Sequence, residues 1–307
     1  MTRTDRPPTD RPFPYAPVAI VGAGAVGSAL GQRLTDCDVP VCAVINRRRA
    51  KAEALAERLG AGVGGTDPQD IPDAARTVFL CVPDDAIEPA ARHLAGEGRD
   101  WTGTLVAHTS GAHTSSLLSP LAEAGGLPLS FHPMQTFTPE TPARAFEGIV
   151  IGIEGNPAAV EPAQHLARLL GARPVVLSAE AKTHYHCAAA LASNGLVALM
   201  GAVRTVLASA GIEGDDADAL LKPLVTETWK NLQDASPEDA LTGPAARNDR
   251  GTIASHLNAL AEDTPALVPL YAELTAEMTR IAERSGRLDP QDAEQLRTFL
   301  QRPSDTG

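Results

Sequence analysis

A glycine-rich turn close to the amino end of the chain restricts its fold more than any other sequence feature. The β-branched run Val18-Ala19-Ile20-Val21 is followed at once by Gly22-Ala23-Gly24-Ala25-Val26-Gly27. Apolar residues then recur with helical spacing at Val26, Leu30 and Leu34. This is the order of a buried strand, a tight turn and a helix, which predicts the first unit of an α/β fold.

The three glycines of this turn have separate roles in binding a pyrophosphate. Gly22 permits the tight turn, Gly24 lets the backbone approach the ligand, and Gly27 lets the helix pack on the sheet. At Ala25 and Val26, free N–H groups and the positive end of the helix dipole face the phosphates. The turn therefore predicts a dinucleotide site, and the alternative is a glycine turn with a structural role alone.

The residues after the second expected strand, Val41 to Ile45, indicate which dinucleotide binds. An Asp or Glu at this point would accept a hydrogen bond from the ribose 2′-hydroxyl of NAD. The chain instead has the uncharged Asn46, followed by Arg47 and Arg48, whose guanidinium groups can pair with a 2′-phosphate. We therefore expect NADP. The alternative is that these arginines only begin a solvated helix.

Short apolar runs alternate with helical patterns over the first part of the chain. Further strands are expected at 78–82, 105–107, 128–131, 149–153 and 174–177, and helices at 49–59, 86–94, 117–124 and 158–170. This alternation predicts an α/β Rossmann domain with a mostly parallel sheet and helices on both faces. After Ser178 the strand patterns stop, and Ala/Leu-rich stretches at 180–210, 215–233, 251–261 and 265–285 predict an all-α domain. We expect a disordered lead-in at 1–16, a dinucleotide-binding domain at 17–178 and a helical domain for substrate binding and dimerisation at 179–301.

Composition and charge limit the partners of the chain. Its 307 residues include 26 Lys and Arg against 38 Asp and Glu, and the net charge of −12 disfavours binding to nucleic acid or to anionic membranes. We expect no membrane helix, because no apolar run approaches the roughly 18 residues that one needs, and no secretory signal in Met1 to Pro17. The cysteines form no C-x-x-C pair, so no metal is expected, and the predicted location is cytoplasmic.

Three polar segments follow expected strands, at the edge of the sheet where ligands bind in open α/β folds. Val82 and Pro83 are expected to lie beside the nicotinamide ribose. Ser110 and Gly111 follow the next strand, and His132 follows the one after it. We expect these three residues to hold a small-molecule carboxylate substrate, because hydroxyl and backbone N–H groups in such loops suit a carboxylate.

The first helix expected in the second domain carries the candidate catalytic residues. Lys182, His186 and Asn194 have a spacing that places them close to one stripe of a regular helix. Lys182 or His186 could give the proton that reduction of a ketone or imine requires, and Asn194 could hold the carbonyl or carboxylate. Arg247, later in the chain, could clamp a substrate carboxylate. The alternative for Lys182 is a polar position in an exposed first turn.

The same helix is apolar over most of its circumference, at Ala188, Leu191, Leu196, Leu199 and Val203. A helix that is covered on all sides is either central to its domain or shared with a partner chain. We therefore expect a homodimer formed through the helical domain.

Six motifs together resemble a known family. They are Gly22 to Gly27, Val82-Pro83-Asp84-Asp85, His108-Thr109-Ser110-Gly111, His132-Pro133-Met134, Lys182-x-x-x-His186 and Leu241-Thr242-Gly243-Pro244-x-x-Arg247. The combination is similar to a bacterial family of Rossmann-like proteins with a C-terminal domain of unknown function, DUF2520. That family resembles a branch of the dehydrogenase group that includes 6-phosphogluconate dehydrogenase and ketopantoate reductase. The resemblance implies a 6-phosphogluconate dehydrogenase C-terminal-like helical domain and a substrate cleft between the domains.

The resemblance also bears on the chemistry. In the hydroxyacid members of the group, a Lys on the first helix of the second domain is the acid/base and an Asn follows one turn later; Lys182 matches that Lys, but His186 stands in place of the Asn. The glycine turn is similar to that of ketopantoate reductase, whereas His132-Pro133-Met134 resembles prephenate and arogenate dehydrogenases.

Three functions are consistent with these residues. The leading hypothesis is an NADPH-dependent oxidoreductase that reduces a small 2-oxo acid, with ketopantoate as the first candidate. The second is an NADP-dependent dehydrogenase of a prephenate-like or other branched or cyclic acid. The third is an NADPH-sensing binding protein that catalyses nothing, since a fold alone does not establish catalysis.

Overall fold

The computed structural model describes residues 12–96 and 98–301, which form two compact units that divide between Ser193 and Asn194. The strands end before Ser178, where the sequence predicts a domain boundary, but helix α6 (Ala179–Ala190) belongs to the first unit. The reason is that its first turns pack on strand β7 (Val150–Gly155) and hydrogen-bond to side chains near it.

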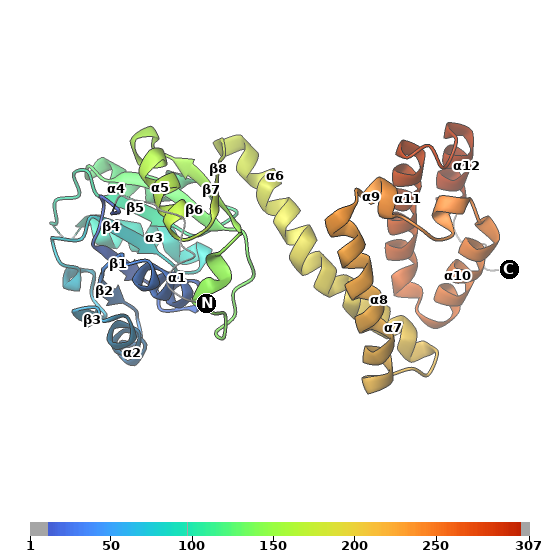
Figure 1. The fold of residues 1–307 in the computed structure, drawn as a ribbon, viewed down its shortest axis with the longest axis horizontal. Coiled ribbons are helices and arrows are strands. Elements are labelled where there is room, and N and C mark those ends of the chain that lie inside the picture. Colours follow the sequence, from blue (N-terminus) through green and yellow to red (C-terminus); the bar gives the residue numbers. More distant parts are fainter. Residues whose placement is uncertain (1–11, 97, 302–307) are drawn as a thin grey trace. The chain divides into compact units, whose positions relative to one another are not determined.

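The first unit is built on a sheet with the strand order β3-β2-β1-β4-β5-β6-β7-β8. Neighbouring strands are parallel except for the antiparallel pair β6 and β7 (Figure 1). The bounds are β1 (Val18–Val21), β2 (Val41–Ile45), β3 (Val63–Gly65), β4 (Thr77–Leu80), β5 (Leu105–His108), β6 (Leu127–Pro133), β7 (Val150–Gly155) and β8 (Arg173–Val176). The predicted mostly parallel sheet is confirmed.

Helices cover both faces of this sheet, as predicted. Helices α1 (Ala25–Asp36), α2 (Arg49–Leu59) and α5 (Pro157–Leu169) pack on one face, and α3 (Asp84–Gly96) and α4 (Ser119–Glu123) pack on the other. The side chains of β1 alternate between the two cores: Ile20 packs in the cluster that contains Leu30 of α1, and Ala19 in the cluster that contains Ile87 of α3. Burial of one large aliphatic side chain contributes about 1.5–3 kcal/mol to the free energy of unfolding, so packing on both faces stabilises the sheet. Short 3₁₀ helices complete the unit at η1 (Pro68–Asp70), η2 (Ser115–Leu118) and η3 (Ala143–Phe146).

Two expectations for this unit are corrected. Strand β3 is not predicted, because Val63-Gly64-Gly65 lacks an apolar run; Gly64 is needed there because a Cβ would lie 2.8 Å from the Cα of Glu53 in α2. The expected disordered lead-in is wrong for its last residues, because Phe13 is buried in the core and stacks on His165. Residues 1–11 of that lead-in lie outside the described residues.

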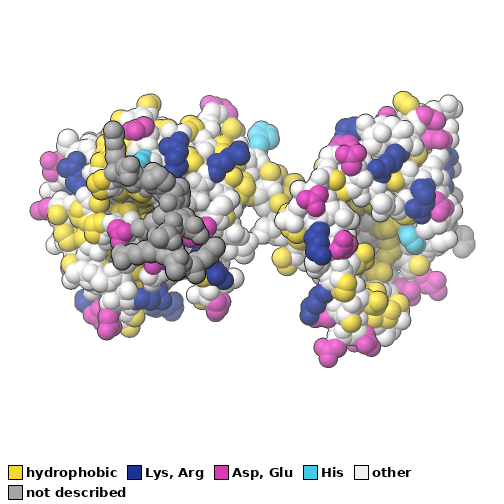
Figure 2. Space-filling model, in the orientation of Figure 1, with side chains coloured by type: hydrophobic (Ala, Val, Ile, Leu, Met, Phe, Trp, Pro, Cys, Tyr) yellow, Lys and Arg dark blue, Asp and Glu magenta, His cyan; other side chains and the backbone are white. Residues whose placement is uncertain are grey.

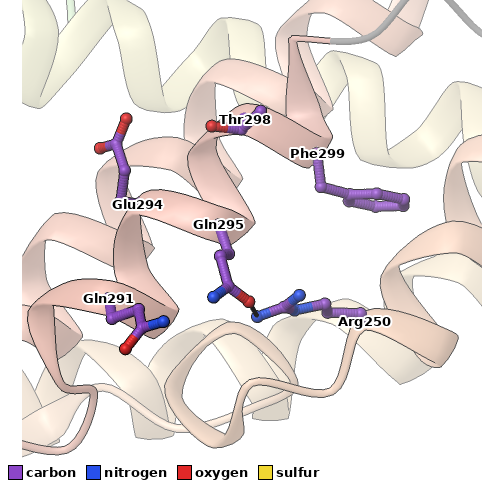
Figure 3. A pocket seen from close by; sticks show the side chains of 6 residues that line it. All are labelled: Arg250, Gln291, Glu294, Gln295, Thr298 and Phe299. Carbon is purple, nitrogen blue, oxygen red and sulfur yellow. Dashed lines mark hydrogen bonds between the residues drawn. The ribbon is translucent and has the colours of Figure 1, made fainter.

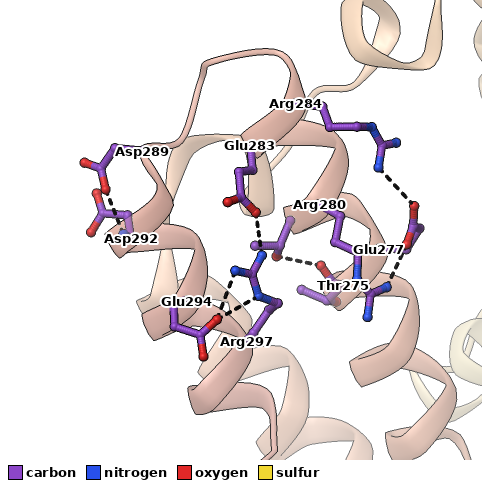
Figure 4. Close-up of polar contacts among 10 residues, drawn as sticks. Thr275, Glu277, Arg280, Glu283, Arg284, Asp289, Asp292, Glu294 and Arg297 are labelled. Atoms are coloured by element: carbon purple, nitrogen blue, oxygen red, sulfur yellow. Dashed lines mark hydrogen bonds and ion pairs between the residues drawn. The ribbon is translucent and has the colours of Figure 1, made fainter.

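The regular secondary structure of the second unit is helical in the described residues, as predicted. Its helices are α7 (Leu196–Ser209), α8 (Gly214–Asp234), α9 (Pro237–Ala240), α10 (Arg250–Asp263), α11 (Val268–Arg284) and α12 (Pro290–Leu300), with 3₁₀ turns η5 (Ala245–Arg247) and η6 (Pro265–Leu267). Helix α12 is an addition to the sequence prediction. Ala282 and Ala293 pack between α11 and α12, and Arg297 of α12 bonds to Glu283 at 2.6 Å and Glu294 at 3.0 Å (Figure 4). Such surface ion pairs contribute at most about 1 kcal/mol each, so the apolar contact is the main stabilising term.

The expectation that no segment is apolar enough to span a membrane is wrong, because one helical segment has the length and the apolar composition that a membrane span needs. The helical segment Ala179–Ser209, in which α6 and α7 are joined by the π-helical turn η4 (Leu191–Gly195), contains an 18-residue window with a mean hydropathy of 1.5. No part of that window is buried, and Leu191 and Val197 are 69% and 72% exposed. Ser193 and Asn194 interrupt the apolar run in the sequence.

Candidate active site

In the glycine turn after β1, a side chain would have space at Gly24 but would clash with the protein at Gly22 and Gly27. Gly22 has φ +110°, and a Cβ there would lie 2.2 Å from a backbone oxygen that follows β4. A Cβ at Gly27 would lie 2.0 Å from the carbonyl oxygen of Gly22, whereas no described atom lies within 4 Å of the Cβ position of Gly24. Since Ala25 and Val26 begin α1, the open space in front of Gly24 is at a helix N-terminus, which fits a pyrophosphate.

Asn46 connects this turn to the loop after β2. Its Oδ1 accepts a hydrogen bond from the backbone N–H of Ala23 at 3.2 Å, and its Nδ2 donates to the carbonyl oxygen of Arg48 at 3.1 Å. Arg47 and Arg48 are exposed, and their side chains make no ion pair with any described residue. Two free guanidinium groups beside the turn fit the 2′-phosphate of NADP.

The loop after β4 lies against the glycine turn, because Val82 Cγ1 is 3.2 Å from the Cβ position of Gly22. Pro83 follows, and α3 begins at Asp84. Both Val82 and Pro83 are thus at the carboxyl edge of the sheet, which is where the nicotinamide ribose is predicted to bind.

His108 holds the loop after β5. Its Nδ1 accepts from the backbone N–H of Ser110 at 3.2 Å, and its Nε2 donates to the carbonyl oxygen of Thr114 at 2.9 Å. Burial lowers the pKa of His108 to about 4, so the ring is neutral and this bonding pattern persists at neutral pH. The result is a fixed position for Ser110, whose carbonyl oxygen also accepts from Ser130 Oγ of β6 at 3.3 Å.

Lys182 of α6 is 1% exposed, and its ammonium group contacts both the loop after β5 and strand β6. Its Nζ donates to Ser130 Oγ at 2.7 Å and to the carbonyl oxygen of Ser110 at 3.1 Å. Burial lowers the pKa of Lys182 to about 8, while the carboxylates of Glu154 and Asp84 act in the opposite direction. The alternative that Lys182 lies in an exposed first turn is therefore wrong, and the group has a pKa suited to proton transfer near neutral pH.

Two histidines approach the backbone of Gly111 beside this lysine. A Cβ at Gly111 would lie 2.4 Å from His186 Nδ1 and 2.7 Å from His132 Nε2. His132 Nδ1 is hydrogen-bonded to the Tyr185 hydroxyl at 3.1 Å, and burial lowers the pKa of His132 to about 4. His186 Nδ1 is buried without a hydrogen-bond partner among the described residues. Lys182 and His186 therefore both lie close to the predicted substrate residues Ser110, Gly111 and His132.

Asn194 and Arg247 belong to the second unit, where both are exposed. The π-helical turn Leu191–Gly195 adds a residue to one turn, so the regular spacing assumed between Lys182 and Asn194 does not continue through it. Arg247 ends the 3₁₀ turn η5, just before α10. The roles of these two residues stay predictions.

A cavity of about 490 Å³ that is lined mostly by polar residues also lies in the second unit, between the start of α10 and helix α12 (Figure 3). Its wall includes Arg250, whose Nη2 donates to Gln295 at 2.9 Å and whose Nε donates to Asn248 at 3.1 Å. These bonds use the guanidinium group of Arg250 to join α12 to the loop before α10.

The residues around Lys182 in the first unit form a cluster, here called the lysine cluster. Three of its residues are additions to the sequence prediction: Ser130, Glu154 and Tyr185. Ser130 and Glu154 face each other in the register of the antiparallel strands β6 and β7. The sequence does contain a signal for these two residues: each is a polar residue in a mostly apolar strand. A buried polar or charged group in such a strand requires a partner. Tyr185 lies one turn after Lys182, and its aromatic ring packs against Gly152 of β7.

Comparison with known proteins agrees with this architecture. Residues 4–133 match the Rossmann-like domain, and residues 149–278 match the domain of unknown function DUF2520. A search of curated proteins found no match.

Several solved structures have the same fold. A protein assigned as an NADP oxidoreductase, from Bacteroides fragilis, is 25% identical, with a TM-score of 0.70 over 87% of this chain and 99% of its own. Protein TM1727 from Thermotoga maritima is 24% identical, with a TM-score of 0.72 over 88% of this chain and 100% of its own. An imine reductase from Myxococcus stipitatus, solved with NADP⁺, is 19% identical, with a TM-score of 0.61 over 92% of this chain and 99% of its own.

The sequence matches and the fold lead to one assignment. The chain combines an N-terminal Rossmann-like domain with a C-terminal domain of the DUF2520 family.

Proposed function

We propose that the protein is an NADP-dependent oxidoreductase that reduces a polarised C=O or C=N bond of a small molecule. The observation that carries this proposal is the buried ammonium group of Lys182, held at 2.7 Å from Ser130 Oγ at the sheet edge that also carries the glycine turn. A non-catalytic sensor of NADPH has no need of a buried lysine with a lowered pKa, because burial of its charge costs stability. The NADP oxidoreductase assignment of the Bacteroides fragilis protein supports the same reaction class.

Each residue of the cluster has a defined part in this reaction. Bound NADPH supplies the hydride. The ammonium group of Lys182 gives a proton to the oxygen or nitrogen atom of the reduced bond, and the hydroxyl of Ser130 and the carbonyl of Ser110 hold that group in place. His132 is neutral, so it accepts or donates a hydrogen bond to substrate without competing for the proton.

The first substrate class to test is a small 2-oxo acid, with ketopantoate as the leading candidate. The hydroxyl of Ser110, the backbone of Gly111 and the ring of His132 are the groups proposed to hold it, because the backbone N–H and carbonyl of Ser110 are already bonded to His108, Ser130 and Lys182. Cyclic imines are the second class, because the fold is shared with the imine reductase of Myxococcus stipitatus. The test is NADPH oxidation at 340 nm with both panels, and with NADP⁺ and prephenate-like acids in the reverse direction. Tight NADPH binding without turnover in any panel would contradict an enzymatic function.

We expect Arg47 and Arg48 to discriminate between the two pyridine nucleotides. Replacing both by Ala removes two charge-assisted hydrogen bonds to the 2′-phosphate, so the KM for NADPH rises about tenfold or more. The KM for NADH stays unchanged, because NADH has a 2′-hydroxyl at that position. Arg49→Ala is the matched control, because Arg49 is paired with Glu53 within α2. Equal effects of the double variant on both nucleotides would contradict the assignment of NADP.

We also propose that the chain is a homodimer through its helical unit. Large apolar side chains of α8 are exposed: Leu220, Leu224, Trp229 and Leu232. The same unit has an apolar hollow of about 380 Å³ between α7, α10 and α11 (Figure 2). Apolar surface of this extent marks an interface on a protein. Light scattering at micromolar concentration is expected to give twice the chain mass, and Trp229→Glu with Leu224→Glu to give the monomer mass. A monomer for the unmodified protein would contradict the proposal.

A further inference from the structure

Glu154 is a buried carboxylate in the lysine cluster. It is 8% exposed and lies in β7 directly opposite Ser130 of β6, the residue whose hydroxyl accepts from Lys182. A carboxylate in such a position needs hydrogen bonds and a positive charge to compensate for the loss of water.

The hydrogen bonds of Glu154 go to the start of the 3₁₀ helix η2. The backbone N–H and the hydroxyl of Ser115 donate to its two oxygens at 2.7 and 2.9 Å. Ser115 follows Thr114, whose carbonyl oxygen accepts from His108, so the loop 109–114 is fixed at both ends. This loop includes Ser110, which accepts a hydrogen bond from Lys182 Nζ.

We infer that Glu154 is the positioning residue for Lys182: its carboxylate holds the loop that carries Ser110, and its negative charge balances the ammonium group. The inference rests on the proposed function, in which Lys182 gives the proton. It assigns a role to a residue that touches neither the dinucleotide turn nor the predicted substrate residues.

The other charged or titratable groups around Lys182 come from four elements. Asp84 begins α3, His108 and His132 lie on β5 and β6, and His186 follows on α6. Burial keeps His108 and His132 neutral above a pH of about 4. The side chain of Asp84 is 49% exposed, so solvent screens its charge. Glu154 is buried, and its charge raises the pKa of Lys182 more than that of Asp84 does.

Two variants separate the charge of Glu154 from its hydrogen bonds. Glu154→Gln removes the charge and keeps the size of the side chain. Ser115→Ala removes one hydrogen bond and keeps the charge. The pKa of Lys182 is measured by NMR on protein with ¹³C-labelled lysine; only Lys51, Lys182, Lys222 and Lys230 contribute signals, and Lys182→Arg identifies the signal of Lys182.

We expect the pKa of Lys182 to fall by about one unit in Glu154→Gln and by no more than about 0.3 in Ser115→Ala. The alkaline limb of the kcat profile for reduction moves by the same amounts, and the KM for NADPH does not change. An unchanged Lys182 pKa in Glu154→Gln would overturn the inference, as would equal shifts in both variants, which would assign the effect to the loop alone. The predicted NMR shifts in a protein that reduces none of the substrates would support the pairing of Glu154 with Lys182 and overturn the proposed function.

Discussion

Replacing Lys182 by Ala is expected to lower kcat by at least about a hundredfold, because a positioned proton donor contributes this much to a reduction that develops negative charge on oxygen or nitrogen. NADPH binding should remain, since the glycine turn and Arg47 make no use of the lysine. Stopped-flow and steady-state assays with the best substrate measure the effect. Lys222→Ala is the control, because Lys222 is an exposed lysine of α8 paired with Asp218. Near-normal turnover in Lys182→Ala would remove Lys182 from the reaction.

The pH profile gives a second readout of the same group. Reduction needs the protonated form of Lys182, whose pKa is lowered to about 8 by burial, so kcat is flat below this pH and falls above it. In the unfolded chain the pKa of Lys182 returns to 10.5, so this group binds more protons in the unfolded state between about pH 8 and 10.5, and its contribution to the free energy of unfolding rises with pH in that window. Lys182→Met fills a similar volume. It should flatten the alkaline limb of the kcat profile and remove the contribution of Lys182 to the free energy of unfolding. Urea denaturation of the variant and of the unmodified protein at pH 7, 9 and 10 measures that contribution.

Replacing Gly24 by Val is expected to weaken NADPH binding about a hundredfold or more and to leave the melting temperature unchanged, because the added side chain fills the space that the pyrophosphate needs. No described atom lies within 4 Å of its Cβ position, so the protein itself accommodates the change. Isothermal calorimetry and thermal unfolding measure the two effects.

Two further glycines serve as controls for this substitution. Gly22→Ala should lower the melting temperature as well, because its Cβ would lie 2.2 Å from the carbonyl oxygen of Cys81 and its φ is +110°. Gly96→Ala, at the end of α3, has open space around it and should change neither property. Wild-type affinity for NADPH in Gly24→Val would place the dinucleotide elsewhere.

The sequence predicts the sheet well where strands are apolar and continuous. Strands β1 and β2 and helix α2 have the predicted bounds, since each has a clear period and a glycine or polar residue at its end. Strand β3 contains two glycines and depends on contact with α2, which a local pattern does not show. The prolines and charges around Phe13 predict a disordered segment, yet its aromatic ring is buried in the core.

In the candidate site, too, some residues could be predicted from local sequence and others depend on contacts between distant elements. Ser110 and His132 could be located near the ligand edge from the sequence because parallel strands end at one edge, although β6 continues to Pro133 and includes His132 instead of ending before it. Ser130 and Glu154 could not, because their meeting depends on the register between β6 and β7. The spacing of Lys182 and His186 predicts a shared face, but a π-helical turn is not visible in the sequence and changes the phase of Asn194.

The reversal of chain direction at β7 determines how helix α6 places Lys182 beside Ser130. Because β7 and β8 run against β6, the chain leaves β8 at the edge of the sheet opposite the one where the glycine turn lies. Helix α6 must therefore travel back alongside the last strands, and on the way Lys182 meets Ser130 and Tyr185 meets His132. In an entirely parallel sheet the helix would start at the ligand edge and run away from it along the sheet. A change of strand polarity thus provides the buried position in which the pKa of the Lys182 ammonium group is lowered to about 8.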